Sequence, residues 1–165
     1  MESTVLTSPV ITPQQFLDHW QGHRNLTRRV IQAFPEDKLF TFSIGGMRPF
    51  ADLAMEMVGM GAPSVRGVVA GKWPSAEEVQ KDYPKPTSAK ELLALWDKAT
   101  EEINRLWPDI PADRFQVMDN FWDQYPGVFY TSILYLIDNE IHHRGQGYVY
   151  LRALGIEPPP FWDRE

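Results

Sequence analysis

The sequence contains no cysteine among its 165 residues. Disulfide bonds, thiolate metal ligands and a cysteine nucleophile are therefore excluded. Basic residues are also in the minority, because 16 Lys and Arg stand against 22 Asp and Glu and leave a net charge of −6. No segment concentrates Lys and Arg, so the sequence lacks the basic surface that binds phosphate backbones. We therefore expect no nucleic acid among the partners.

Long apolar runs are absent as well. No run approaches the roughly 20 apolar residues that a membrane-spanning helix needs. Residues 1–5 lack the basic and apolar segments of a secretory signal. We therefore expect a cytoplasmic protein with no membrane partner. The length suits one folding unit, so residues 1–165 are expected to form a single domain with a buried core.

What the sequence does contain is a helical periodicity in four segments. Apolar residues recur every three or four positions, as in amphipathic helices, over residues 12–34, 49–61, 88–107 and 127–154. The first and third segments each begin with a capping box, a Ser or Thr followed three residues later by Glu or Gln. The sequence therefore predicts an all-α protein, and specifically a four-helix bundle.

The connections between the predicted helices differ in length. Residues 62–86 form the longest irregular stretch, in which prolines and glycines interrupt the pattern and one short helix is expected at 75–81. A connection this long suits a crossover between two parallel helices. The predicted bundle is therefore up-down-down-up, with the crossover between its second and third helices. Residues 109–126 are expected to be a loop with one hairpin near 115–118.

Three ionisable residues fall on the inner sides of three predicted helices: His23, Glu56 and His143. Side chains from facing helices build metal sites in bundles, and imidazole and carboxylate groups are suitable ligands. We therefore consider a metal site formed by His143, Glu56 and His23. The alternative is that Glu56 and His143 only hydrogen-bond each other as a buried pair, and that His23 is a core histidine.

The last predicted helix carries more apolar surface than one bundle core covers. We expect part of it to be buried by the loops or by a second subunit. Gly145 and Gly147 lower the stability of this helix, so a close approach by another helix is expected at both. Arg144 is expected to be solvated or paired at an interface.

Two motifs resemble a known family. Residues 140–146 (Glu-Ile-His-His-Arg-Gly-Gln), followed by Tyr-Val-Tyr-Leu-Arg at 148–152 and Leu-Gly at 154–155, resemble the C-terminal signature of the DinB/YfiT-like superfamily. Residues 48–56 (Arg-Pro-Phe-Ala-Asp-Leu-Ala-Met-Glu) resemble the second-helix motif of that family. The resemblance implies a four-helix bundle, commonly a homodimer, that often binds a divalent metal through three histidines. For some members it implies a thiol-dependent transferase or isomerase activity.

The chain departs from this pattern at the implied metal ligands. Only His143 matches, because Glu56 and Asn139 stand where the other two family histidines are expected. Two explanations stay open. Either the site has been rebuilt from His143, Glu56 and His23 and holds zinc or nickel, or the metal has been lost and a hydrogen-bonded polar cluster fills its place.

Two functions follow from these explanations. With a metal, the chain would be an enzyme of the thiol-dependent transferase type, in which the metal activates a water or a small thiol. Without a metal, it would be a non-catalytic, dimeric bundle whose polar cavity binds a small-molecule ligand or is structural. In both cases Asn139, Glu140 and Gln146 are expected to line the cavity.

Overall fold

The computed structural model describes residues 10–165. The long helices are α1 (Pro13–Ala33), α3 (Phe50–Ala70), α5 (Ala89–Leu106) and α6 (Phe129–Ala153). The shorter elements are α2 (Glu36–Leu39), α4 (Ala76–Asp82), the 3-10 turns Trp107–Asp109 and Ala112–Gln116, and the strands β1 (Met118–Phe121) and β2 (Tyr125–Val128). The predicted all-α class is confirmed, with one small hairpin. Within residues 10–165, no helix combines the length and the apolar character that crossing a membrane requires.

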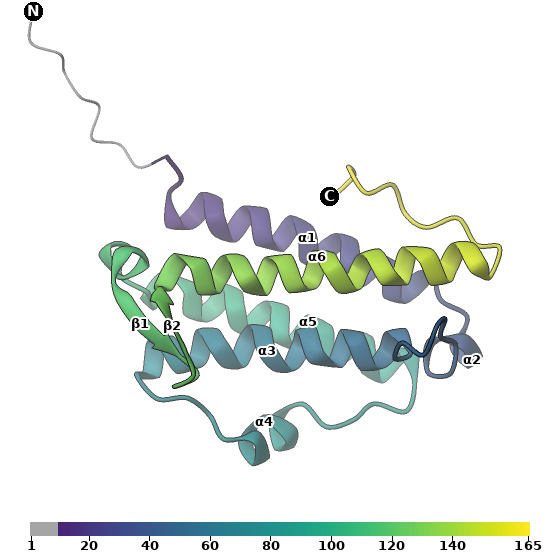
Figure 1. Cartoon of the computed structure of the whole chain (residues 1–165), viewed down its shortest axis with the longest axis horizontal. Coiled ribbons are helices and arrows are strands. Elements are labelled where there is room, and N and C mark those ends of the chain that lie inside the picture. Colours follow the sequence, from purple (N-terminus) through teal and green to yellow (C-terminus); the bar gives the residue numbers. More distant parts are fainter. Residues whose placement is uncertain (1–9) are drawn as a thin grey trace, which may run out of the picture.

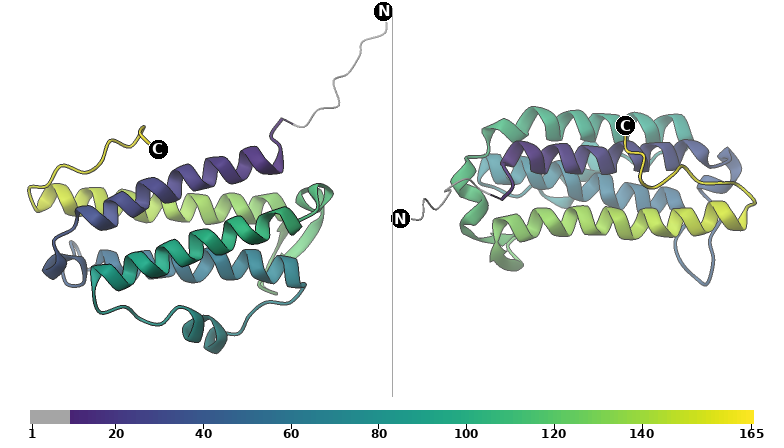
Figure 2. Two further views of the ribbon diagram at one scale, coloured as in Figure 1. Left: turned by 180° about the vertical axis from the view of Figure 1, so that it is seen from behind. Right: turned by 90° about the horizontal axis from the view of Figure 1, so that it is seen from above.

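The four long helices lie side by side (Figures 1 and 2). α3 and α5 run in the same direction, because the segment between them, which contains α4, travels back along the length of the helices (Figure 1). α1 and α6 run the opposite way. The β1–β2 hairpin lies at one end of the helices, with Met118 paired to Val128 and Phe121 paired to Tyr125. It begins a few residues later in the chain than the hairpin predicted near 115–118.

Local sequence determines where the helices begin. Thr12 and Gln15 form the expected capping box at the start of α1. At the start of α5, the Ser88 side chain accepts a hydrogen bond from the backbone N–H of Glu91. Each contact satisfies a backbone N–H that has no partner inside the helix. The short helix predicted at 75–81 is also present, as α4.

One predicted helix end is wrong. The sequence predicts an end near Gly61, but α3 continues through Pro63 to Ala70. A proline inside a helix costs about 3 kcal/mol or more, because it removes one hydrogen bond and crowds a carbonyl group. Burial offsets this cost, since Pro63 and its neighbours on both sides are buried. The backbone of Gly67 packs directly on the ring of Trp73, which leaves no room for a Cβ.

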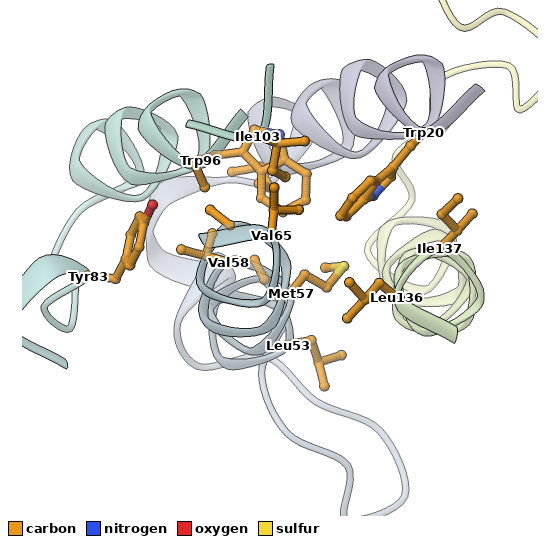
Figure 3. Packing of buried hydrophobic residues seen from close by; sticks show 14 of the residues in the cluster. Trp20, Leu53, Met57, Val58, Val65, Tyr83, Trp96, Ile103, Leu136 and Ile137 are labelled. Carbon is orange, nitrogen blue, oxygen red and sulfur yellow. The ribbon is translucent and has the colours of Figure 1, made fainter. Parts of the chain in front are cut away.

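The apolar core lies between the long helices. Trp20 from α1, Leu53 and Met57 from α3, Ile103 from α5 and Leu136 from α6 all contribute to it (Figure 3). These side chains come from segments far apart in the sequence, so the core joins all four helices. In Figure 3, Met57 of α3 lies next to Leu136 of α6, the two helices that carry the candidate site.

Candidate functional site

The candidate site lies where α3, α6 and the loop before α3 meet. We call Arg48, Glu56, Asn139, His143 and Gln146 the Glu56 cluster. Glu56 is on α3, Arg48 is in the loop, and the other three residues are on α6. Asn139 and His143 are four residues apart, so they share one face of α6. Helical spacing therefore places Asn139 and His143 side by side on α6, and the packing of α3 against α6 brings Glu56 to them.

Glu56 is the centre of the cluster. Its Oε1 atom lies 2.9 Å from Nε2 of His143 and accepts a hydrogen bond from Nδ2 of Asn139 at 3.2 Å. Its Oε2 atom accepts one from the guanidinium of Arg48 at 2.5 Å. Partial burial alone would raise the pKa of Glu56, but hydrogen bonds from His143, Arg48 and Asn139 together lower it to about 2. The carboxylate is therefore ionised at neutral pH, and donors surround both oxygens.

His143 faces an acceptor on each ring nitrogen. Nε2 faces the Glu56 carboxylate, and Nδ1 lies 3.0 Å from Oε1 of Gln146. Because an ionised carboxylate can only accept, Nε2 carries a hydrogen and donates it to Glu56. The His143 side chain is 9% exposed. While the bond to Glu56 is in place, Nε2 has no lone pair to offer a ligand.

A second polar region lies between α1, α5 and α6. We call Trp20, Arg24, Thr27, Glu140 and Arg144 the Glu140 network. The Glu140 carboxylate accepts hydrogen bonds from Thr27 Oγ1 at 2.7 Å and Trp20 Nε1 at 3.3 Å. The guanidinium groups of Arg24 and Arg144 lie 3.8 and 3.9 Å from it. Burial raises the pKa of Glu140, and the two guanidinium groups oppose that shift. All five side chains are buried.

The structure places His23 beside this network and not with Glu56 and His143. Its Nδ1 atom lies 2.9 Å from a guanidinium nitrogen of Arg144. Arginine can only donate, so Nδ1 accepts. Burial, followed by the charges of Arg144 and Arg164 and by His19, lowers the pKa of His23 to about 3. The ring is therefore neutral, and its Nε2 atom lies 3.2 Å from both Nε2 of His19 and a guanidinium nitrogen of Arg164.

A groove of about 770 Å³ runs along another face of α3. It is bounded by α3, by the segment that contains α4 and by the tip of the hairpin. Its lining is mostly apolar, and its larger side chains are those of Phe40, Met55, Met60, Tyr83, Trp122 and Tyr125. The Glu56 cluster lies outside this lining, although Met60 is only one helical turn from Glu56.

Comparison with known proteins decides the family. A profile of the DinB family matches residues 1–164. The chain belongs to the DinB family. A DinB-like protein from Bacillus subtilis is 17% identical, with a TM-score of 0.71 over 92% of this chain and 99% of that one. A DinB-like protein from Bacillus cereus is 22% identical, with a TM-score of 0.69 over 90% and 97% of the two chains. At these identities the likeness shows a shared fold. Comparison with curated proteins finds no significant match.

The DinB resemblance implies three metal-binding histidines, and this chain has other donors in their place. Glu56, Asn139 and His143 do lie together, within 3.3 Å of one another. However, Glu56 already binds the Arg48 cation, an amide is a poor ligand for zinc, and His143 directs an N–H at Glu56. No three His, Asp or Glu side chains within residues 10–165 form a group able to hold a metal ion. The side chains present do not fit the implied metal.

His23 does not supply the missing ligand. A metal-bound histidine normally donates its second N–H to a carboxylate or a carbonyl oxygen. In this DinB-family chain the second nitrogen of His23 would meet the guanidinium of Arg144, which has no acceptor. The three residues expected to line one cavity lie in two different regions. Asn139 and Gln146 belong to the Glu56 cluster, whereas Glu140 is buried in the Glu140 network.

Sequence reasoning missed three arginines. Arg48 completes the Glu56 cluster, and Arg24 and Arg144 belong to the Glu140 network. The expectation that Arg144 is solvated or at an interface is wrong, since this side chain is buried within the chain. Its position four residues after Glu140, on the same face of α6, is the signal that could have shown this. Arg48 lies in a loop, where no helical spacing points to its partner.

Proposed function

We propose that this DinB-family chain is a metal-free, non-catalytic four-helix bundle, up-down-down-up, that binds a small apolar molecule. The observation that carries the proposal is the 2.5 Å hydrogen bond from Arg48 to Glu56. The guanidinium supplies the positive charge that a metal ion would otherwise bring to this carboxylate. Asn139 and His143 satisfy the other oxygen. The cluster then acts as a tie between the loop before α3 and helix α6.

The surroundings of His143 also support a structural role for the cluster. A carboxylate and a histidine can form a general base, but the base needs a free ring nitrogen within reach of a substrate. In His143, Nε2 is bonded to Glu56 and Nδ1 lies beside Gln146. Both nitrogens are therefore used inside the protein, and the buried ring offers no edge to a substrate.

The competing function is a metal-dependent enzyme of the thiol-dependent transferase type, with zinc or nickel on His143 and Glu56. Metal binding requires that Arg48 release Glu56. It also requires that the His143 nitrogen that now donates an N–H to Glu56 present a lone pair to the ion. Both changes break hydrogen bonds of 2.5 and 2.9 Å. The metal-free function needs neither change, so the geometry favours it.

The groove along α3 supports the binding function. Small-molecule sites are usually concave and mostly apolar, with volumes of about 300–1,000 Å³. The groove meets each of these conditions, with a volume of about 770 Å³ and a mostly apolar lining that includes methionine and aromatic side chains. Asp52 and Lys85 supply a charge of each sign at its walls. We infer an apolar ligand with a single polar end.

Elemental analysis tests the metal-free part of the proposal. We expect protein purified without a histidine tag to contain less than about one tenth of an equivalent of any transition metal. The double variant Glu56→His with Asn139→His restores the three histidines that the resemblance implies, and we expect it to bind about one equivalent of zinc. The same variant with His143→Ala is the control and should bind far less. Stoichiometric metal in the unaltered protein, or no zinc in the double variant, would contradict the proposal.

Titration with anilinonaphthalene sulfonate, an apolar fluorescent probe with one charged end, tests the groove. Met55→Glu places a charge in the apolar wall, and we expect it to raise the Kd of the probe by about tenfold or more. The matched control is Met47→Glu, because Met47 is exposed and does not line the groove. Equal weakening by the two variants, or none by either, would place the probe elsewhere and count against the groove.

A further inference from the structure

The tip of the β1–β2 hairpin places an aromatic side chain in the wall of the groove. Trp122 and Asp123 are the two central residues of its turn. The backbone N–H of Gln124 closes the turn by donating to the carbonyl oxygen of Phe121 at 3.2 Å. The hairpin extends from α6 to α3 (Figure 1), where the indole N–H of Trp122 donates to the buried hydroxyl of Ser64 at 2.9 Å. Trp122 is therefore anchored on α3, and it lines the groove.

The backbone of this turn is unusual for the residues that form it. Trp122 and Asp123 have φ angles of 54° and 56°, and within residues 10–165 every other positive φ belongs to a glycine. Hairpin turns with two positive φ angles normally contain Asn, Asp or Gly, because a positive φ crowds the Cβ atom of a bulky residue. A smaller residue at 122 would form the same turn with less strain. The indole ring is therefore kept at a cost to the turn, which points to a use for the ring.

The Trp122 ring is one half of a stacked pair. It lies against the ring of Trp73, with the ring centroids 5.5 Å apart and the planes inclined by 19°. Trp73 is itself held in place, because its ring packs on the bare backbone of Gly67. The stack therefore rests on α3, and it fixes the plane of Trp122. A ring whose plane is fixed in advance loses little freedom when a ligand binds to it.

A second, smaller hollow of about 290 Å³ adjoins the groove at the hairpin. Met60, Trp122 and Tyr125 line both spaces. Trp73 lines neither of them. The Trp122 side chain is partly exposed, and since one of its faces lies on Trp73, the exposed surface borders the groove and the hollow. Flat rings stack on such a surface, and the thioether of Met60 offers a further contact that aromatic rings favour.

We propose that the groove binds a molecule with a planar aromatic ring, and that this ring stacks on Trp122 beside Met60 and Tyr125. This class of ligand rests on the binding function proposed above. Asp52 lines the groove eight residues before Met60 on α3, a distance of about 12 Å along the helix. The polar end of the ligand would then lie toward the start of α3. An alkyl chain could also fill the groove, but it would gain nothing from the flat face of Trp122.

Isothermal titration calorimetry of the full chain with two probes tests the proposal. Naphthalene-2-sulfonate and decane-1-sulfonate share their charged group and their number of carbon atoms, but only the first has flat rings. Trp122→Leu keeps an apolar side chain and removes the ring. It should raise the Kd of naphthalene-2-sulfonate at least about fivefold and that of decane-1-sulfonate less than about twofold. Trp122→Phe keeps a ring and should restore most of the binding of naphthalene-2-sulfonate.

The two probes separate this proposal from the binding function on which it rests. If neither probe binds the unaltered protein, the binding function and the aromatic class are both overturned. If both probes bind and Trp122→Leu weakens them equally, the groove is still a binding site but the aromatic class is overturned. Trp162→Leu is the matched control, because Trp162 is 74% exposed and lies outside the groove lining. This variant should leave both Kd values unchanged.

Proton NMR of the probes gives a second test that needs no change at Trp122. Stacking places the ring protons of naphthalene-2-sulfonate over the indole, so they should shift upfield when the unaltered protein is added. Asp123→Gly relieves the neighbouring positive φ without altering the ring. This variant should melt at the same or a higher temperature and produce the same upfield shift. Naphthalene protons that bind without shifting upfield would contradict the stacking on Trp122.

Discussion

The Glu56 cluster and the Glu140 network use the same chemistry in different surroundings. Each centres on one carboxylate that is bound by arginine and by neutral hydrogen-bond donors, and each includes side chains from α6. In the cluster, the Arg48 and Glu56 side chains are 53% and 28% exposed. In the network, the Arg24 and Glu140 side chains are 1% and 2% exposed. The two regions therefore differ mainly in their access to water.

That difference decides what each region can do. In the Glu56 cluster, water can replace a lost partner, so its residues are exchangeable and other donors could stand at the same positions. In the Glu140 network the side chains are shielded from solvent, so the loss of one partner would leave an unpaired buried charge. The network is consequently part of the fold, whereas the cluster lies where the DinB resemblance implies metal ligands.

The largest effect should come from the Glu140 network. Glu140→Gln keeps the size of the side chain but leaves Arg24 and Arg144 without a buried counter-ion. We expect a loss of about 3–5 kcal/mol in the free energy of unfolding. Urea denaturation followed by circular dichroism measures it. The matched change Glu56→Gln should cost less, about 1–2 kcal/mol, because solvent screening reduces the stabilisation that its lowered pKa implies, and equal losses in the two variants would remove the contrast between the regions.

The next effect is a loss of folding stability at acid pH that comes from His23. The pKa of His23 is lowered from 6.5 to about 3, first by burial and then by Arg144. Between these values the unfolded chain binds a proton that the folded chain does not, so stability is complete above pH 6.5 and falls as the pH drops toward 3. His23→Asn should remove this part of the decline, because the amide oxygen can still accept from Arg144. Urea denaturation at a series of pH values measures it, and unchanged slopes would refute it.

Glu56 should respond in a lower pH range. Its pKa falls from 4.5 to about 2, because hydrogen bonds from His143, Arg48 and Asn139 outweigh the effect of burial. The stabilisation from Glu56 is therefore complete above pH 4.5 and is lost as the pH drops toward 2. In Glu56→Gln this loss should be absent. Between pH 4.5 and 6.5 only the His23 variant should differ in slope from the unaltered protein, so the two regions can be separated in one set of titrations.

The smallest effect should come from Arg48, the most exposed member of the two regions. Arg48→Ala removes one exposed ion pair, and we expect a loss of about 0.5 kcal/mol that shrinks as salt is added. Thermal melting in low and high salt measures it. A loss as large as that of Glu140→Gln would show that the Glu56 cluster is as essential to the fold as the Glu140 network.

The sequence predicts most of the helices because their signals are local. The capping residues Thr12 and Ser88 mark helix starts correctly, and Gly155, with a positive φ, follows the end of α6. The end of α3 could not be predicted, since the burial that stabilises Pro63 comes from distant segments. The rule that a proline ends a helix considers only the local sequence, and here tertiary packing overrides it.

The candidate site shows a similar division. The Glu56–His143 bond is one of the alternatives that the sequence offers, and the structure contains it. His23 lies elsewhere, because helical periodicity gives the inner face of a helix but not the neighbour that this face meets. Arg48 could not be found from spacing, because it reaches Glu56 from a loop. The sequence therefore gives ligand candidates, and only the fold gives their partners.

The contact between Phe50 and Gly147 has a mechanical consequence. The ring of Phe50, at the first residue of α3, rests on the bare backbone of α6 and acts as a spacer that fixes the distance between the two helices. A larger residue at position 147 would be a wedge one turn from His143. It would lengthen the bond from His143 to Glu56 without touching either residue. Position 147 thus governs the alignment of the Glu56 cluster from outside it.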